Sequence, residues 1–191
     1  MRVLSVNVGC ARPLRAGART VLSAIGKRAV DGAVEATALG LAGDEQADLS
    51  VHGGLHKAVY AYPTEHYPRW QSARREAGVS LFDETLPWGF LGENLSIEGL
   101  VEGEVWIGDR LRFAHCILRV TAPREPCHKF TEVMGMGRAA RLMVQHTACG
   151  FYLAVEVPGP IAAGDTFALE AGPRGLKISD AFLARKLKHL R

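Results

Sequence analysis

Residues 51–62 read Val-His-Gly-Gly-Leu-His-Lys-Ala-Val-Tyr-Ala-Tyr and join a polar turn to a compact apolar strand. The two adjacent glycines permit a tight turn, because glycine has no Cβ to restrict its backbone. The run at residues 58–62 combines β-branched and aromatic residues, which is typical of a strand. A turn needs the glycines but not ionisable side chains, and this one also holds His52, His56 and Lys57. This stretch therefore predicts both a strand and a candidate binding loop.

Short strand patterns of the same kind recur along the chain and are separated by Gly-Asp turns. Further strands are expected at residues 2–8, 20–25, 32–39, 93–97, 105–106, 110–114, 116–121, 151–157 and 166–169. Helices are expected at residues 64–76, 138–144 and 179–190, and loops at residues 9–19 and 40–54. Two prolines within residues 122–129 argue against regular strand pairing there. Many short strands and few helices predict a mostly β fold with peripheral α, built as a closed or partly closed β-barrel with a few short helices.

The composition is that of an ordinary globular protein, with 48% hydrophobic and 23% charged residues among 191. We expect one domain over residues 1–175, followed by a short basic C-terminal helix at residues 176–191. The net charge of +3 is mild, so we expect no specific binding to nucleic acid. The sequence contains no run of about 18 apolar residues, so no membrane span is expected. The N-terminal residues resemble a strand rather than a signal peptide, so a cytoplasmic protein is expected.

Cys127 is the strongest candidate for a functional thiol. It follows Pro123-Arg124-Glu125-Pro126 and precedes His128 and Lys129. Positive neighbours favour the thiolate form of a cysteine, which is both a nucleophile and a metal ligand. The alternative is a small buried hydrophobic residue, the usual role of a free cysteine. The remaining cysteines lie in apolar strand patterns without CxxC spacing, and we assign them to packing as free thiols: Cys10, Cys116 and Cys149.

The loop at residues 51–57 leaves three interpretations open. His52 and His56 are four residues apart, a spacing that on a helix presents both imidazoles to one metal. Gly53-Gly54 between them disfavours a helix, so a zinc site with Cys127 remains one alternative. In a second interpretation, the glycine amides and Lys57 cradle an anion such as phosphate. The third is a plain β-turn with exposed polar side chains, although long polar loops are often functional.

Three motifs follow one another in a characteristic order. They are H-G-G-x-x-K-A-V-x-x-Y-P from His52, G-E-N-L from Gly92 and P-R-x-P-C from Pro123. Asn94 in the second motif can both donate and accept hydrogen bonds, although an asparagine there is usually structural. In this order, over about residues 1–175, the chain resembles the MOSC domain family. It looks closest to the stand-alone bacterial members involved in resistance to 6-hydroxylaminopurine.

The resemblance implies a β-barrel that binds the molybdenum cofactor, a pterin dithiolene with a phosphate group. Cys127 matches the family cysteine that is expected to bind molybdenum, and a thiolate suits a soft metal–sulfur centre. The phosphate needs positive charge and backbone amides, which Lys57, Arg124 and the glycine turn would supply. The full set of expected cofactor-binding residues is Cys127, His52, Gly53, Gly54, Lys57, Asn94, Arg124 and Lys129.

The implied reaction is reductive cleavage of an N–O bond in a small N-hydroxylated substrate. R–NHOH, two electrons and two protons give R–NH2 and water, while molybdenum changes its oxidation state. A protonated His52 or His128 would assist the loss of water, and with Cys127 these form the expected catalytic set. The chain has no G-x-G-x-x-G motif for NAD or flavin, so we expect a separate reductase to supply the electrons.

Two alternatives to a reductase follow from the same residues. The protein could be a non-catalytic carrier of the cofactor, or of sulfur on Cys127, or it could be a zinc or thiol hydrolase. A homodimer is the default expectation among soluble oligomers. The chain departs from its relatives in two ways, since His56 replaces a usually acidic residue, and only residues 179–191 follow the barrel where long relatives have a helical bundle.

Overall fold

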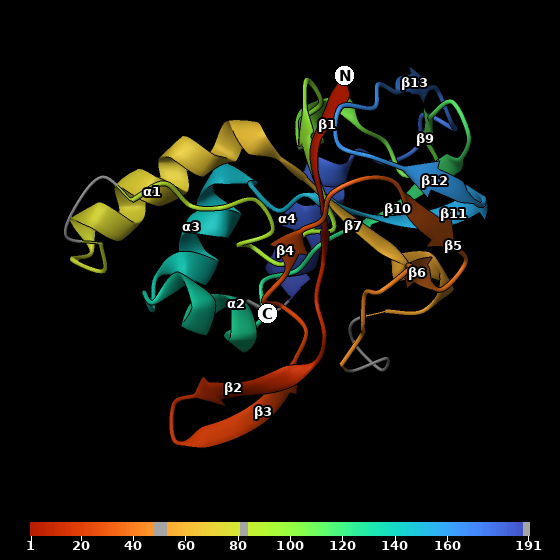
Figure 1. Ribbon diagram of the computed structural model, residues 1–191. Helices are drawn as coiled ribbons and strands as arrows, with labels where there is room; N and C mark the ends of the chain where they lie inside the picture. The colour runs from red at the N-terminus through yellow and green to blue at the C-terminus, as the bar shows by residue number, and fades with distance from the viewer. Residues whose placement is uncertain (48–52, 81–83, 189–191) are drawn as a thin grey trace.

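The computed structural model describes residues 1–47, 53–80 and 84–188, without the side chains of residues 185–188 (Figure 1). Its strands are β1 (Arg2–Val8), β2 (Arg12–Ala16), β3 (Arg19–Ser23), β4 (Arg28–Ala29), β5 (Val34–Thr37), β6 (Gly40–Leu41), β7 (Val59–Pro63), β8 (Leu95–Glu98), β9 (Arg110–Arg112), β10 (Ile117–Pro123), β11 (Phe151–Val157), β12 (Gly159–Ile161) and β13 (Ala168–Glu170). Its helices are α1 (Tyr67–Glu76), α2 (His128–Met134), α3 (Ala139–His146) and α4 (Ile178–Lys188). Three short 3-10 turns are η1 (Leu55–Lys57), η2 (Thr64–His66) and η3 (Glu102–Glu104).

The main sheet has eight strands in the order β13-β9-β10-β11-β7-β8-β1-β4, and only the β7–β8 pair is parallel. All five residues of β7 are buried, because this strand lies in the middle of the sheet between β11 and β8. A second sheet joins β12, β5 and β6, and β2 and β3 form a separate hairpin. The expectation of a mostly β fold with a few peripheral helices is therefore confirmed.

The expected closure into a barrel is not confirmed, because β13 and β4 remain at the two edges of the sheet. The segment before β13 touches β1 only near its start, through a bridge between Arg2 and Thr166. Three hydrogen bonds accompany this bridge, from Val3 N to Asp165 O (2.9 Å), from Gly164 N to Val3 O (2.8 Å) and from Phe167 N to Met1 O (3.2 Å). The other end of β1 pairs with the two-residue strand β4 instead. The two ends of the sheet thus meet along a short seam rather than a full ladder.

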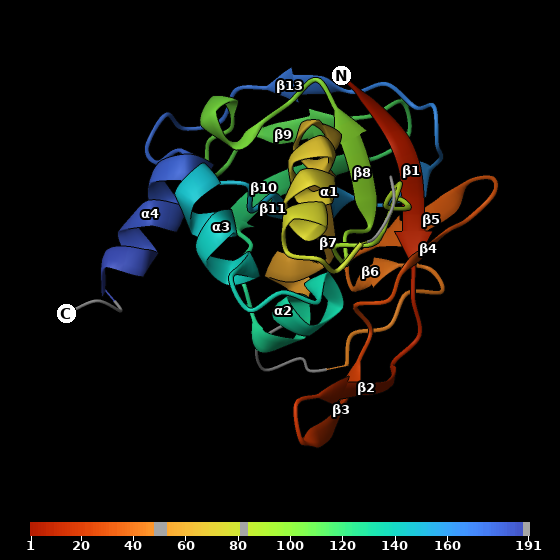
Figure 2. The same cartoon turned by 90° about the vertical axis from the view of Figure 1, so that its left-hand side faces the viewer.

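The helices cover the main sheet and complete the core. Helix α1 lies across one face of the sheet, with Trp70 fully buried against it (Figure 2). The ring of Trp70 packs edge-on against Phe130 of α2, with ring centroids 5.5 Å apart. Helix α4 packs on β10, and its residues Ile178 and Phe182 are fully buried. No helix within the described residues has both the length and the apolar character needed to cross a bilayer.

Two of the segments that differ from the expected elements lie beside the site described below. The expected loop at residues 9–19 contains β2, whose half-exposed Arg-Pro-Leu-Arg-Ala sequence hides its strand pattern. The prolines at residues 122–129 predict that regular strand pairing ends before them, but β10 continues to Pro123, which pairs with Phe151. A proline is tolerated at a strand end because few ladder bonds remain to be made there. Helix α2 then begins directly after Cys127.

Candidate functional site

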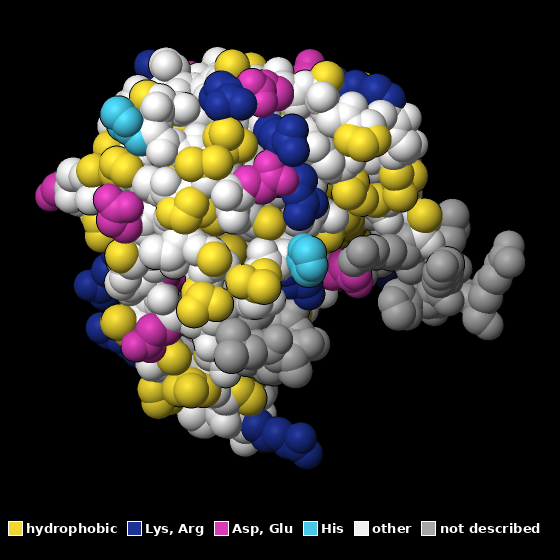
Figure 3. Space-filling model, turned by 90° about the vertical axis from the view of Figure 1, so that its right-hand side faces the viewer, with side chains coloured by type: hydrophobic (Ala, Val, Ile, Leu, Met, Phe, Trp, Pro, Cys, Tyr) yellow, Lys and Arg dark blue, Asp and Glu magenta, His cyan; other side chains and the backbone are white. Residues whose placement is uncertain are grey.

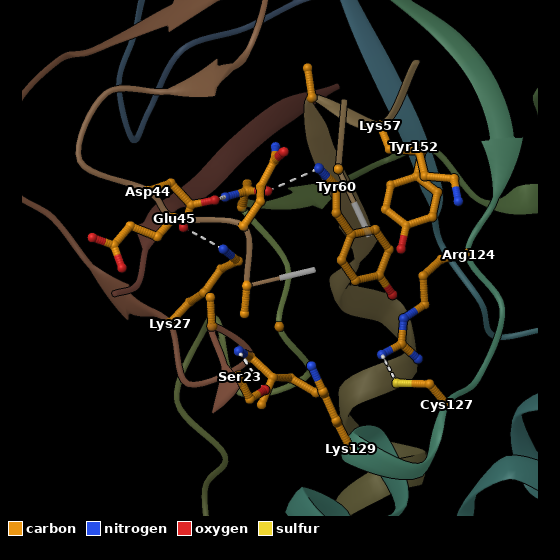
Figure 4. A pocket seen from close by; sticks show the side chains of 18 residues that line it. Ser23, Lys27, Asp44, Glu45, Lys57, Tyr60, Arg124, Cys127, Lys129 and Tyr152 are labelled. Carbon is orange, nitrogen blue, oxygen red and sulfur yellow. Dashed lines mark hydrogen bonds and ion pairs between the residues drawn. The ribbon is translucent and has the colours of Figure 1, made fainter. Parts of the chain in front are cut away.

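A pocket of about 630 Å³, counted out to its open mouth, lies where six segments of the chain meet (Figure 4). These segments are the end of β3, the turn at Asp44, η1 with the start of β7, the loop before β8, the β10–α2 connection and β11. The labelled lining residues in Figure 4 are Ser23, Lys27, Asp44, Glu45, Lys57, Tyr60, Arg124, Cys127, Lys129 and Tyr152.

Cys127 lies at one side of this pocket and is half-buried. It occupies the position before the first residue of α2, and its carbonyl oxygen accepts a hydrogen bond from Thr131 N at 3.2 Å. Arg124 Nη2 lies 3.9 Å from Cys127 Sγ and can donate to it. The thiol is thus held by a helix start, beside a permanent positive charge and facing a cavity.

The other cysteines lie in different surroundings. Cys116 and Cys149 are buried, as packing residues should be. Burial raises the pKa of the Cys116 thiol to about 12 and raises that of Cys149 well above its ordinary value, so both stay protonated. The expectation that Cys10 packs in the interior is wrong, because this residue is exposed just after β1. Among the cysteines, Cys127 alone lines the pocket.

Arg124 is a buried cation without a carboxylate partner among the described residues, being only 4% exposed. Its guanidinium lies over the rings of Phe130 (4.9 Å) and Tyr60 (5.6 Å), and Nη1 lies 3.9 Å from Met143 Sδ. Burial lowers the pKa of Arg124, but the neighbouring Tyr60 and Cys127 groups outweigh burial and raise it overall. The side chain therefore stays charged, in contact with aromatic rings and sulfur atoms and without a described carboxylate partner.

The opposite wall of the pocket is an ordered polar network. Lys27 Nζ and Asp44 Oδ1 form an ion pair, and both side chains are largely buried. Asp44 also accepts hydrogen bonds from Gly9 N and from Asn94 Nδ2, each at 2.8 Å. Asn94 Nδ2 further donates to a backbone carbonyl, and Asn94 Oδ1 accepts from Tyr60 N at 3.0 Å. The amide hydrogens of Asn94 are thus used within the protein, so this residue holds the wall in place.

Two tyrosines from neighbouring strands form an aromatic side of the pocket. Tyr60 of β7 and Tyr152 of β11 pair across the sheet, with ring centroids 5.5 Å apart. Lys57 Nζ lies 5.6 Å from the centre of the Tyr152 ring. Burial raises the pKa of both phenols, so both hydroxyls stay protonated at neutral pH. The hydroxyl of Tyr60 donates to Cys149 O at 2.9 Å, which fixes the ring.

The structure gathers most of the expected site residues into this one pocket: Gly53, Lys57, Asn94, Arg124, Cys127 and Lys129. Gly54 is not among the lining residues, and its φ of +81° is one that glycine adopts readily. His128 is exposed at the start of α2 and does not line the pocket. His52, which was expected to bind the cofactor and to assist the loss of water, lies outside the described residues.

The zinc alternative finds no support in the described residues. Across residues 1–47, 53–80 and 84–188, no three His, Cys, Asp or Glu side chains are grouped to hold a metal ion. His56 is exposed in η1. The proposed zinc set also includes His52, which lies outside these ranges.

The expected site does not include Lys27, Asp44, Tyr60 or Tyr152, which supply the polar and aromatic walls of the pocket. Lys27 and Asp44 form their ion pair across 17 residues of chain, and Tyr60 meets Tyr152 only through strand pairing. The Gly43-Asp44 turn was a visible motif, but nothing local linked it to Asn94, which is 50 residues further along the chain.

Comparison with known proteins places these features in one family. The MOSC domain pattern matches residues 48–168. The chain is 36% identical to Protein YiiM from Escherichia coli (strain K12), over 83% of this chain and 69% of that protein. It is 35% identical to a protein named Reductase from Gibberella moniliformis (strain M3125 / FGSC 7600), over 80% of this chain but only 26% of that protein. The crystal structure of YiiM from Geobacillus stearothermophilus superposes with a TM-score of 0.73 at 27% identity, covering 98% of this chain and 83% of that one.

Proposed function

Because this chain belongs to the MOSC domain family, we propose that it binds the molybdenum cofactor beside Cys127 and reduces N-hydroxylated compounds such as 6-hydroxylaminopurine. A separate reductase supplies the electrons. The main supporting observation is a half-buried thiol 3.9 Å from the buried guanidinium of Arg124, which has no carboxylate partner among the described residues. The name of the fungal relative, Reductase, also favours the oxidoreductase class.

The donor groups of the pocket suit this cofactor. A thiolate is a soft ligand, as a metal–sulfur centre requires. Lys57, Arg124 and Lys129 line the pocket and supply positive charge for a phosphate group. The rings of Tyr60 and Tyr152 offer an aromatic surface of the kind that flat heterocycles pack against.

Each residue has a distinct part in the proposed reaction. When bound, the cofactor supplies a metal centre capable of two-electron redox chemistry. Cys127 Sγ holds the metal, and the charge of Arg124 stabilises the thiolate form of that sulfur. Tyr152 lies beside Arg124 and keeps its proton, so its hydroxyl can donate a hydrogen bond to a substrate oxygen. The overall change is R–NHOH with two electrons and two protons to R–NH2 and water.

The test compares Cys127→Ser with Cys10→Ser, since Cys10 is an exposed thiol outside the pocket. Both variants and the wild type are produced in a host that makes the cofactor, and molybdenum, pterin and zinc are then measured. We expect Cys127→Ser to lose molybdenum and the dye-driven reduction of 6-hydroxylaminopurine, whereas Cys10→Ser keeps both.

Retained molybdenum and an unchanged rate in Cys127→Ser would remove Cys127 from its proposed role. Stoichiometric zinc without molybdenum or pterin would reject the proposal as a whole. Bound cofactor without any reduction, even with a competent electron donor, would instead identify a carrier.

A further inference from the structure

A cationic arm extends from the pocket into solvent. We define this arm as residues 12–28, which form β2, β3 and the chain up to the start of β4. It contains five basic residues and no acidic one: Arg12, Arg15, Arg19, Lys27 and Arg28. The hairpin projects away from the rest of the molecule in two perpendicular views (Figures 1 and 2). Basic and hydrophobic side chains are visible at the lower end of the molecule, where this hairpin lies (Figure 3).

The arginines of the arm are not neutralised within the described structure. Arg12, Arg15 and Arg19 are exposed, and none forms an ion pair with a described carboxylate. Exposed arginines elsewhere on the sheet do pair with glutamates: Arg2 with Glu98, Arg110 with Glu156 and Arg112 with Glu170. The charge of Arg12, Arg15 and Arg19 is therefore available to a partner, whereas Lys27 at the base of the arm is paired with Asp44.

The outer face of the hairpin places Arg15 beside an apolar centre, while Arg12 and Arg19 lie on the other face of the ribbon. Pro13 lies opposite Leu22 and Arg15 lies opposite Thr20, so these pairs share one face of the ribbon. All four residues are exposed, and Leu22 is 53% exposed. An apolar spot with charged neighbours is typical of protein interfaces. Residues 12–28 include no aromatic side chain on which a nucleic-acid base could stack, which disfavours single-stranded nucleic acid as the partner.

The arm is attached to the pocket and close to its thiol. Ser23, at the end of β3, and Lys27 both line the pocket. Lys129 Nζ donates a hydrogen bond of 2.8 Å to Leu22 O, and this lysine is only two residues from Cys127. A protein seated on the arm would therefore lie beside the pocket mouth.

We propose that the cationic arm docks an acidic electron-carrier protein, which delivers electrons to the pocket beside Cys127. This inference rests on the proposed function, because a reduction needs an electron source outside the chain. Opposite charges speed the encounter of two proteins by about 10- to 1000-fold, and salt weakens the effect. Interfaces for electron transfer are small, which suits a surface the size of one hairpin.

The test uses the cofactor-loaded full chain and two electron sources, a reduced acidic flavodoxin and a small reduced dye. The arm variant is Arg15→Glu with Arg19→Glu, at two exposed positions that do not line the pocket. The matched control is Arg69→Glu with Arg141→Glu on α1 and α3, which changes the net charge by the same amount. We expect the arm variant to lose at least tenfold in flavodoxin-driven rate at low salt, with its dye-driven rate within twofold of wild type. The control should retain both rates.

Equal flavodoxin-driven rates in the arm variant and the control would overturn the inference. The inference would also be overturned if the arm variant lost nucleic-acid binding while its flavodoxin-driven rate stayed unchanged. A wild type without dye-driven reduction would refute the proposed function instead. In that case, calorimetry with oxidised flavodoxin tests docking separately from the reaction. Binding by the wild type that the arm variant loses supports the inference, and no binding or equal binding overturns it.

Discussion

Arg124 shows what a single side chain reveals about this pocket. A buried charge is costly unless another group compensates for it. The rings of Phe130 and Tyr60 offset part of the cost through cation–π contact, but no described carboxylate does so. Proteins keep such unfavourable features mainly where function requires them. An anionic ligand bound next to Cys127 would complete the compensation.

Replacing Arg124 by Met should therefore separate stability from binding. Because the cofactor-free protein loses an uncompensated buried charge, its free energy of unfolding should change by less than about 1 kcal/mol. Affinity for the cofactor should fall at least tenfold, or about 1.4 kcal/mol. Urea unfolding and the pterin content after purification measure the two effects.

The matched control is Arg74→Met, because Arg74 is also a buried arginine but is paired. Its guanidinium bonds to Glu84 at 3.0 Å and donates to Met134 O at 2.7 Å. We expect this variant to lose about 2 kcal/mol of stability through its broken hydrogen bonds. Equal destabilisation in the two variants would mean that Arg124 is a structural residue.

At the scale of elements, the strands with clear alternation were predicted and the atypical elements were not. Strands β1 and β11 occupy the expected residues 2–8 and 151–157. The sequence predicts a loop where β2 forms, because the arginines and proline of β2 are exposed on a ribbon with no sheet behind it. Helix α2 was missed because its seven residues are too few to show a helical period.

Helix α4 offers a test of packing at this scale. Phe182 is fully buried, whereas its neighbour Leu183 is 41% exposed. Phe182→Ala should lower the free energy of unfolding by about 3–5 kcal/mol, because it leaves a cavity under the helix. Leu183→Ala should cost less than about 1 kcal/mol. Denaturant unfolding of both variants measures the difference, and similar losses would show that α4 does not contribute to the core.

At the scale of the whole molecule, the sheet nearly returns to its own start without closing. Its two ends meet at the seam where Val3 N donates to Asp165 O and Gly164 N donates to Val3 O, beside the Arg2–Thr166 bridge. The middle of the sheet, by contrast, has ladders on both sides of β11, with six residue pairs to β10 across two register shifts and three to β7. The seam should therefore open locally while the middle of the sheet stays intact.

Hydrogen exchange can measure this difference. We expect the amides of Val3 and Phe167 at the seam to exchange at least tenfold faster than those of Val120 and Leu153 at the centre. The reason is that a few bonds must open at the seam, whereas exchange at the centre requires unfolding of the sheet. Equal protection at both places would mean that the sheet behaves as a closed barrel.

The sequence by itself determined the strand-rich fold, the ordered motifs of the MOSC family, and Cys127 as the thiol of interest. These depend on local pattern, since strand alternation and motif spacing are properties of neighbouring residues. Only the tertiary structure decided that Lys27, Asp44 and Tyr152 belong to the same pocket as Cys127. Their contacts join strands and turns far apart in the chain, and the pairing of distant strands depends on packing of the whole core rather than on any local pattern.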